Sequence, residues 1–311
     1  MLPDAAPSLS IVVPVYNEAE SLVELHGELA EVLGTLGEPY EVIYVDDGST
    51  DASPALLADL SARDAHTRVL TMPRNGGKSA AYAAAFLAVR GQVVFTLDAD
   101  LQDDPHEIPQ MLAKVREGWD LVVGWKQHRL ENEPLKALPS RVFNGLGTRL
   151  FGLSLHDANC GFRAMRAVVA RRLLLYGDLY RFIPQLTHVA GFRVCEAPVN
   201  HRKRRHGVSK YGPRRFWTGL LDLLTVRFIT RYAERPLHFF GTVGLVPTTL
   251  GLALEVYVLG QKWMGSTFQT HVAAIIVGVL LLIMGFQCVI TGLIGEMLTA
   301  QAFQRGPGRS R

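Results

Sequence analysis

An uncharged run of 23 residues, Val272–Ile294, constrains the fold of this chain more than any other feature. A second run, Phe239–Leu259, is apolar apart from Glu255. Each is long enough to cross about 30 Å of hydrocarbon as a helix. Because the link between them is short, the two runs predict a transmembrane hairpin at about 239–259 and 272–294. The alternative is a pair of buried helices in a soluble core, where uncharged runs of this length are rare.

Basic residues gather just before the first apolar run. Between Arg202 and Arg235 there are ten Lys and Arg residues against only Asp222 and Glu234, in a chain whose net charge is +3. Such a segment favours an anionic partner such as lipid headgroups or phosphates. Beside two apolar runs, we expect a lipid bilayer rather than nucleic acid. The positive-inside rule then places both termini in the cytoplasm, in an integral protein of the inner or plasma membrane.

The chain divides into four predicted parts. Residues 1–212 form a cytoplasmic domain, 213–236 an amphipathic helix at the membrane interface, 237–300 the two spans, and 301–311 a basic cytoplasmic tail. For the interfacial helix, packing on the soluble domain is an equal alternative. Within the second span, small residues recur every seven positions and favour a homo-oligomer through helix contacts; they are Gly278, Gly285 and Gly292.

Residues 8 to about 200 alternate between apolar β-rich runs and helical patterns. This alternation predicts an α/β domain with a Rossmann-like, mainly parallel sheet. Ligands of such sheets bind at the carboxyl ends of the strands. The polar residues that fall at these ends are Asn17, Glu18, Asp46, Asp47, Asp98, Asp100 and Lys126.

Several classes of enzyme are excluded by missing motifs. The first strand is followed by "PVYNEAES" instead of the glycine-rich fingerprint of dinucleotide-binding domains. The stretch "NGGKSAA" contains Gly-Lys-Ser, but Met72 stands where a P-loop needs its first glycine. No serine nucleophile elbow and no His/Cys zinc spacing occur. The three cysteines are scattered, which fits a reducing compartment.

Six motifs occur in one order along nearly the whole chain. They are "IVVPVYNE" (Ile11–Glu18), "VDDGSTD" (Val45–Asp51), "RNGGKSAA" (Arg74–Ala81), "DADLQDDP" (Asp98–Pro105), "DANCGFRAMR" (Asp157–Arg166) and "HRKRRHGVSKYG" (His201–Gly212). In this order they resemble the family 2 glycosyltransferases of the GT-A fold. With the terminal hairpin, the chain resembles the polyprenyl-phosphate glycosyltransferases, which include dolichol-phosphate mannose synthases and bacterial undecaprenyl-phosphate glucosyltransferases. The Gln-x-x-Arg-Trp motif of processive synthases is absent.

The resemblance implies a metal-assisted transfer. A divalent ion such as Mg²⁺ or Mn²⁺ would stabilise the charge that develops on a nucleotide-sugar's diphosphate. Hard oxygen ligands suit these ions, and the resemblance implies Asp98, Asp100 and Gln102. Asp104 is interpreted as a helix cap, and Asp103 as a cap or a ligand. We expect the charge that compensates these carboxylates to arrive with the substrate, since most cations lie later in the chain.

The resemblance also implies contacts to the donor nucleotide. It places them at Pro14, Tyr16, Glu18, Asp47 and Asp98. Asp46 and Asp47 have the alternative role of forming a tight Asp-Gly turn. Lys78 begins a predicted helix, where an anion is favoured, and could reach the nucleotide.

A lipid-phosphate acceptor would need cations at the membrane surface. The best candidates are Arg163, Arg202 and Lys210, followed by Arg141, Lys126 and Arg129. The run Arg202–Arg205 also attracts headgroups nonspecifically, at ~1 kcal/mol per residue. Within this run the phosphate contact could shift from one cation to the next.

The expected reaction is transfer of a sugar from a nucleotide-sugar to undecaprenyl phosphate by single displacement with inversion. A phosphate monoester is mostly dianionic near neutral pH and needs no strong base. Asp157 and Asp100 are the catalytic candidates, with positioning more important than proton transfer. Because a chain with this hairpin resembles the bacterial glucose-loading enzymes, the resemblance implies UDP-glucose rather than GDP-mannose as the donor. The alternatives are a glycolipid or glycan hydroxyl acceptor, and a membrane scaffold with a degenerate domain.

Overall fold

The protein comprises two compact units, Met1–Val226 and Arg227–Arg311. The computed structural model describes residues 7–127, 145, 147–202, 215–233 and 235–305. The first unit is built on a seven-stranded sheet and the second on two long helices. Each unit is described here by itself.

The sheet of the first unit has the strand order β3-β2-β1-β4-β6-β5-β7. All neighbouring pairs are parallel except those of β6, which runs antiparallel to both β4 and β5. The predicted α/β fold with a mainly parallel sheet is therefore confirmed. The strands are β1 (Leu9–Val15), β2 (Tyr40–Asp46), β3 (Thr67–Thr71), β4 (Val93–Thr96), β5 (Leu121–Lys126), β6 (Arg163–Arg166) and β7 (Val194–Val199).

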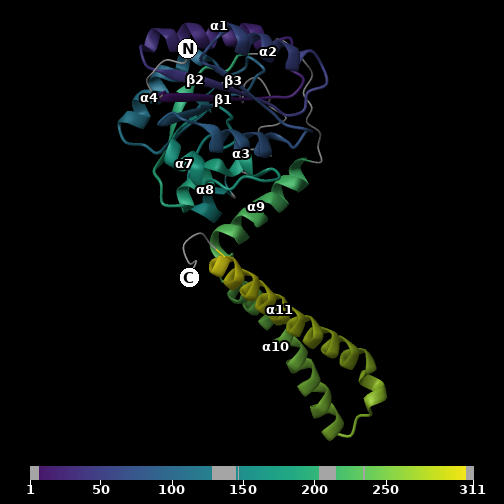
Figure 1. Ribbon diagram of the computed structural model, residues 1–311. Coiled ribbons are helices and arrows are strands. Elements are labelled where there is room, and N and C mark those ends of the chain that lie inside the picture. Colours follow the sequence, from purple (N-terminus) through teal and green to yellow (C-terminus); the bar gives the residue numbers. More distant parts are fainter. Residues whose placement is uncertain (1–6, 128–144, 146, 203–214, 234, 306–311) are drawn as a thin grey trace. The chain divides into compact units, whose positions relative to one another are not determined.

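Helices cover both faces of this sheet. Figure 1 shows α1 and α2 on one face and α3, α7 and α8 on the other. The helices of this unit are α1 (Leu22–Leu36), α2 (Ser53–Arg63), α3 (Lys78–Ala88), α4 (Ile108–Arg116), α7 (Ala167–Arg172) and α8 (Ile183–Val189), with the 3₁₀ turns η1 (Pro105–Glu107) and η2 (Leu179–Phe182). Helix α9 (Arg215–Tyr232) contains the boundary between the two units.

Local sequence explains the first βαβ unit. Strand β1 is an apolar run that is buried on both faces, as expected for a strand in the middle of a covered parallel sheet. Helix α1 buries Leu22, Leu25 and Leu29, which recur at helical spacing. It ends at Gly37, whose φ of 66° is the left-handed conformation that glycine adopts without a steric penalty.

The strand order places a switch point between β1 and β4. From β1 the chain moves outward through β2 to β3, and it then crosses back to form β4 on the other side of β1. In open α/β sheets, the loops that leave the carboxyl ends of such strands separate and form a crevice. The loops after β1 and β4 begin at Tyr16 and Leu97, so this is where a ligand is expected.

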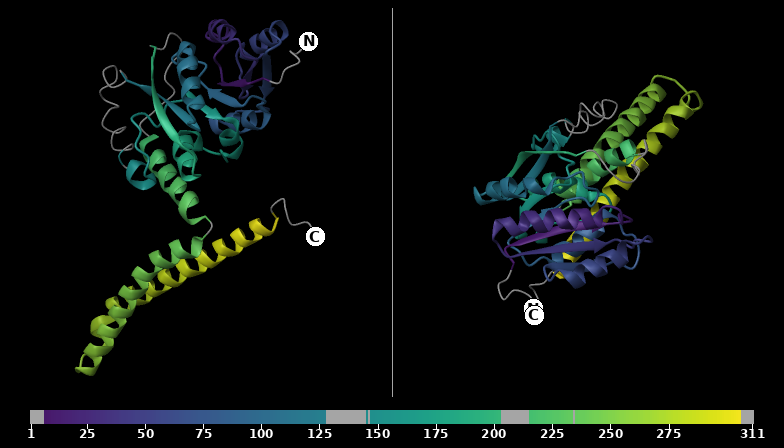
Figure 2. Two further views of the ribbon diagram at one scale, coloured as in Figure 1. Left: turned by 90° about the vertical axis from the view of Figure 1, so that its left-hand side faces the viewer. Right: turned by 90° about the horizontal axis from the view of Figure 1, so that it is seen from above.

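The second unit is a hairpin of α10 (Pro236–Trp263) and α11 (Val272–Arg305), joined by the 3₁₀ turn η3 (Phe268–His271). The two helices run side by side in both views of Figure 2. Both are long and apolar enough to cross a membrane. Helix α10 extends beyond the first predicted span at both ends, and α11 extends beyond the second only at its C-terminal end.

Small residues let the two helices of the hairpin approach closely. A Cβ atom at Gly244 would lie 2.9 Å from the carbonyl oxygen of Gly285, and one at Gly251 would lie 2.9 Å from that of Gly278. A Cβ atom at Gly292 would lie 3.0 Å from the Cα atom of Leu237. The three glycines that predict an oligomer therefore face α10 of the same chain. The stripe therefore serves packing within the hairpin, and a homo-oligomer stays a prediction.

The close approach of the helices can be tested at Gly244. We expect Gly244→Val to destabilise the hairpin by about 1–3 kcal/mol, because the larger side chain forces the helices apart. Gly241→Val is the matched control, since a Cβ atom there meets nothing within 4 Å. Thermal unfolding in detergent measures both. Equal unfolding temperatures for the two variants would contradict this packing.

One histidine makes the first unit sensitive to pH. His26 on α1 lies with Nδ1 3.3 Å from the Tyr44 hydroxyl and Nε2 3.7 Å from Asp64. Burial lowers the pKa of His26 from its ordinary 6.5, and the nearby Asp64 carboxylate offsets only part of this effect. The folded protein therefore binds a proton at this site less readily than the unfolded chain does.

We expect stability to fall as the pH decreases below about 6.5, the ordinary pKa of histidine. In that range His26 binds a proton in the unfolded chain more readily than in the folded protein, because its pKa is lower in the folded protein. Protonation therefore favours unfolding. His26→Gln removes this contribution and should make the loss of stability between about pH 7 and pH 5 shallower. Unfolding temperatures measured across this range test the expectation. An unchanged slope in the variant would refute it.

Candidate active site

The loop after β2 forms a tight turn and also binds the glycine loop that precedes α3. Asp46 Oδ1 accepts from the Ser49 N–H at 2.9 Å, so Asp46 forms the predicted turn. Gly48 completes it with a φ of 70°. Asp47 instead accepts from the N–H groups of Gly76 and Gly77, at 2.7 and 2.9 Å. Asp47 therefore fixes the glycine loop that leads into α3, and its contact to a nucleobase stays a prediction.

The loop after β1 is tied to the loop after β2. Asn17 adopts a φ of 55°, which is uncommon outside glycine, and its Oδ1 accepts from the Thr50 N–H at 2.8 Å. The Glu18 N–H donates to Ser53 Oγ at 3.0 Å. These bonds hold Tyr16 and Glu18 at the switch point. Their roles toward a nucleotide, with that of half-buried Pro14, remain predictions.

The segment Asp98–Pro105 reverses sharply after β4. Leu101 has a φ of 60° and is buried in the core. Asp100 Oδ1 accepts from the Gln102 N–H at 3.2 Å. A left-handed leucine is strained, and such residues are frequent at functional sites. The strain is balanced here by burial of the Leu101 side chain.

The two remaining acidic residues of this segment are structural. Asp103 is buried, with Oδ2 accepting from the Asp98 N–H at 3.2 Å and Oδ1 lying 2.8 Å from Lys126 Nζ. Asp104 accepts from the His106 N–H at 3.1 Å and caps η1. The interpretation of Asp104 as a helix cap is confirmed. Asp103 anchors the loop from inside.

Three cations of the protein compensate the Asp98 carboxylate. Burial raises the pKa of Asp98, but Lys78, which is ion-paired with it, and then Lys126 and Arg163 together hold it below its usual range. For Lys78 the effects have the opposite sign. Burial lowers its pKa, but Asp98 and two neighbouring tyrosines raise it, so that the pKa lies above its usual range. The expectation that compensating charge arrives only with the substrate is wrong. The protein supplies it from α3, β5 and β6.

Arg163 lies in the core and not at the surface. It is fully buried in β6, directly opposite Thr96 of β4 in the sheet register. Its three guanidinium nitrogens have no hydrogen-bond partner among the residues that the structure describes. Buried N–H groups without hydrogen-bond partners are costly, so this guanidinium, besides helping to compensate Asp98, is suited to bind a further anion. The sequence indicated the cation, but the short strand that buries it was missed.

The motif "CGFR" also closely approaches Asp98. Thr96 Oγ1 donates to the Gly161 carbonyl at 2.8 Å, which brings this glycine against the end of β4. A Cβ atom at Gly161 would lie 2.9 Å from Asp98 Oδ1.

Asp157 is buried, and its N–H donates to Glu196 Oε1 at 2.9 Å. Burial raises the pKa of Cys160 to about 12, so its thiol stays neutral.

The other predicted acceptor cations are placed differently. Arg202 is ion-paired with Glu28 and Asp104, each at 2.7 Å. Lys126 is engaged by Asp103. Arg129, Arg141 and Lys210 lie outside the described residues, so their roles stay predictions.

The residues present fit a hard divalent ion. Carboxylates of Asp98 and Asp100 and the amide of Gln102 offer oxygen ligands on one short loop. Within the described ranges, no three His, Cys, Asp or Glu side chains form a group that could hold a metal by themselves. A metal here would therefore need ligands from a bound substrate in addition to these residues.

The first unit is thus an α/β domain whose switch point carries both carboxylates and cations. The sequence model described as "Glycosyl transferase family 2" matches residues 10–174. The chain belongs to this family and is a glycosyltransferase.

Two curated relatives match almost the whole chain. The dodecaprenyl-phosphate galacturonate synthase of Rhizobium johnstonii is 38% identical over 93% of this chain and 87% of its own length. The undecaprenyl-phosphate 4-deoxy-4-formamido-L-arabinose transferase of Edwardsiella ictaluri is 35% identical over 93% of this chain and 88% of its own. The resemblance to polyprenyl-phosphate glycosyltransferases inferred from the six motifs is confirmed.

Solved structures support the fold. Glucosyl-3-phosphoglycerate synthase from Mycobacterium tuberculosis, in complex with Mn²⁺, uridine diphosphate and glucosyl-3-phosphoglycerate, superposes with a TM-score of 0.55. It covers 71% of this chain and 80% of its own, at 18% sequence identity. At this identity the match shows a common fold and nothing more.

Gly161 offers a direct test of its close approach to Asp98. We expect Gly161→Ala to weaken Mn²⁺ binding about tenfold, because the new methyl group displaces the Asp98 carboxylate. The control is Gly34→Ala on α1, where a Cβ atom meets nothing within 4 Å. Mn²⁺ titration followed by electron paramagnetic resonance measures both variants. Unchanged affinity in Gly161→Ala would show that Asp98 is not a metal ligand.

Proposed function

We propose that the protein transfers a sugar from a nucleotide-sugar to a polyprenyl phosphate at the cytoplasmic face of a membrane. The observation that carries this proposal is that the carboxylate loop Asp98–Gln102 lies near the buried guanidinium of Arg163, whose nitrogens have no hydrogen-bond partner within the described part of the chain. The carboxylate loop suits a metal-bound diphosphate, and the Arg163 guanidinium suits a second anion. The names of both curated relatives include a polyprenyl phosphate, and α10 and α11 suit a membrane anchor.

The donor half of the reaction depends on charge. A bound Mg²⁺ or Mn²⁺ would neutralise negative charge on the departing nucleoside diphosphate. Asp98, Asp100 and Gln102 would hold that ion. Lys78 lies at the start of α3, and once Asp98 turns to the metal it is free to contact a diphosphate oxygen. Asp47 keeps the glycine loop before Lys78 in place.

The acceptor half depends on positioning. A phosphate monoester has its second pKa near ~6 and is already a nucleophile at neutral pH. The phosphate would have to reach the buried Arg163 guanidinium, which would then orient it for in-line attack on the anomeric carbon. Such an attack gives inversion in a single displacement. Asp157 is held by Glu196 at the start of the same loop. We assign it to the orientation of the acceptor and not to proton removal.

A donor screen tests the proposal. The full chain in detergent is incubated with Mn²⁺ or Mg²⁺, undecaprenyl phosphate and a series of nucleotide-sugars. UDP-glucose comes first, followed by GDP-mannose and donors of the two sugars named in the relatives. Mass spectrometry should find one lipid-linked sugar. Undecaprenol in place of its phosphate should give no product; product from the alcohol, or none from any donor, would overturn the proposal.

Asp100 should be essential for this transfer. We expect Asp100→Asn to lower kcat/KM about a hundredfold or more, since a direct metal ligand matters at least as much as its supporting residues. Asp59→Asn on α2 is the control, because among the described residues Asp59 forms an ion pair only with Arg63, on the same exposed helix. Initial rates with the donor found in the screen give the comparison. Full activity of Asp100→Asn would remove this residue from the site.

A further inference from the structure

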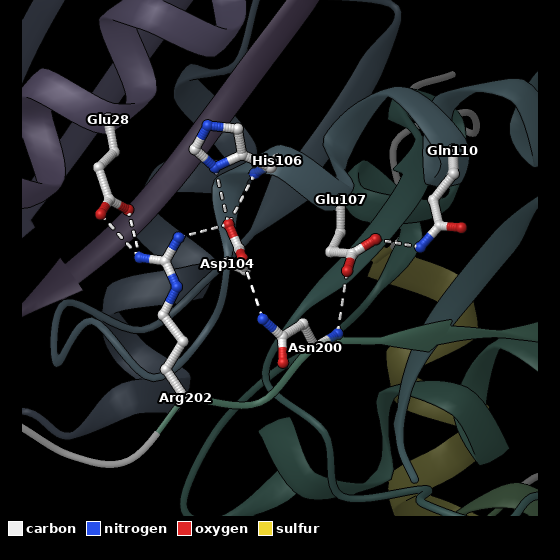
Figure 3. A network of polar contacts seen from close by, with 7 residues as sticks. All are labelled: Glu28, Asp104, His106, Glu107, Gln110, Asn200 and Arg202. Carbon is white, nitrogen blue, oxygen red and sulfur yellow. Dashed lines mark hydrogen bonds and ion pairs between the residues drawn. The ribbon is translucent and has the colours of Figure 1, made fainter.

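A cluster of polar side chains joins the end of β7 to α1 and to the carboxylate loop (Figure 3). At its centre, Arg202 Nη1 lies 2.7 Å from both carboxylate oxygens of Glu28 on α1. Its Nη2 donates to Asp104 Oδ1, also at 2.7 Å. We call the three residues Glu28, Arg202 and Asp104 the clasp. All three side chains are at least 80% buried, so these ion pairs are only weakly screened.

The backbone of Arg202 is bound to the same loop as its side chain. Its N–H donates to the Gln102 carbonyl at 2.9 Å. The neighbouring His201 forms an isolated antiparallel bridge with Asp103. Arg202 therefore holds the peptide of a predicted metal ligand with its main chain, while its side chain is anchored on a different helix.

Further bonds fix Asp104 from the other side. Asn200 Nδ2 donates to Asp104 Oδ2 at 3.2 Å, and His106 Nδ1 lies 2.9 Å from Asp104 Oδ1. The Asn200 N–H in turn donates to Glu107 Oε1 at 3.1 Å. Both oxygens of Asp104 are thus occupied, and its carboxylate cannot turn toward a metal without breaking this network.

The geometry of the clasp argues against Arg202 as a phosphate ligand. Both terminal guanidinium nitrogens already bind carboxylates in charge-assisted bonds, which are the strong class of hydrogen bond. Binding a lipid phosphate would leave Glu28 and Asp104 partly buried without their cation. Removing one partner of such a pair is strongly unfavourable.

We propose that the clasp positions the Asp98–Gln102 loop for the metal and the donor, and that Arg202 is a positioning residue. The proposal rests on the proposed function, because it assigns Gln102 to the metal site. Glu28 is then the outermost support of that site, although it lies in a different part of the sequence and contacts no substrate. Supporting residues of this kind typically change metal affinity by 10–100-fold when they are altered.

The test measures Mn²⁺ binding with and without UDP, on the full chain in detergent and without acceptor or turnover. The variants are Glu28→Gln, Arg202→Lys and the double variant. Glu31→Gln is the matched control, an exposed glutamate three residues further along α1. Glu28→Gln keeps the side-chain shape and should fold, which thermal unfolding verifies.

We expect Glu28→Gln and Arg202→Lys each to weaken Mn²⁺ binding by about 10–100-fold. The double variant should be little worse than either single one, because the residues act through one contact. The KM for polyprenyl phosphate should stay within about twofold of the wild type in Glu28→Gln. Glu31→Gln should match the wild type throughout.

Three results would overturn the clasp. The first is a loss of thermal stability in Glu28→Gln with unchanged Mn²⁺ affinity, which would show a purely structural role. The second is a raised acceptor KM in Arg202→Lys alone, which would make Arg202 a phosphate ligand. The third is a Glu28→Gln variant with the Mn²⁺ affinity of a wild-type protein that binds Mn²⁺ and transfers sugar. This result would refute the clasp but leave the proposed function intact. A wild-type protein that binds neither Mn²⁺ nor UDP refutes the proposed function as well.

Discussion

The balance of charge around Asp98 is the constraint on which the site depends. A carboxylate at the end of a buried strand loses hydration and stays ionised only if cations lie close by. Lys78 from α3, Lys126 from β5 and Arg163 from β6 fulfil this requirement together. Because Lys126 is also ion-paired with Asp103, the same charges fix the path of the loop. The same ion pairs therefore compensate the charge of Asp98 and determine the conformation of the loop.

This balance explains why the antiparallel strand β6 matters. Inserted between β4 and β5, it brings Gly161 and Arg163 from a later part of the chain against the end of β4. Glycine is needed there because any side chain would meet the Asp98 carboxylate. The motif "CGFR" thus combines a residue that makes room with one that brings charge. Both residues reach Asp98 only because β6 pairs with β4.

The sequence allowed the alternation of strands and helices, the hairpin and the loop at Asp98 to be predicted, because each is encoded by a local pattern. Periodicity and strand-end polar residues are sufficient for that. It did not allow β6 to be predicted, since four residues with arginine at both ends carry no strand signal. The partners of Asp98, Asp103 and Arg202 were also missed. These contacts join residues that are far apart in the chain, and no local pattern specifies which cation meets which carboxylate.

The position of Arg202 also changes how the basic segment is interpreted. Counting charges along the sequence treats Arg202–Arg205 as four equivalent cations facing one membrane. In the fold, Arg202 is neutralised by Glu28 and Asp104, which come from distant parts of the chain. An ion pair between partly buried groups weakens the long-range field that either charge would otherwise exert. The first cation of the run therefore belongs electrostatically to the carboxylate loop and its flanking residue Asp104, and any attraction to lipid headgroups would have to come from other cations.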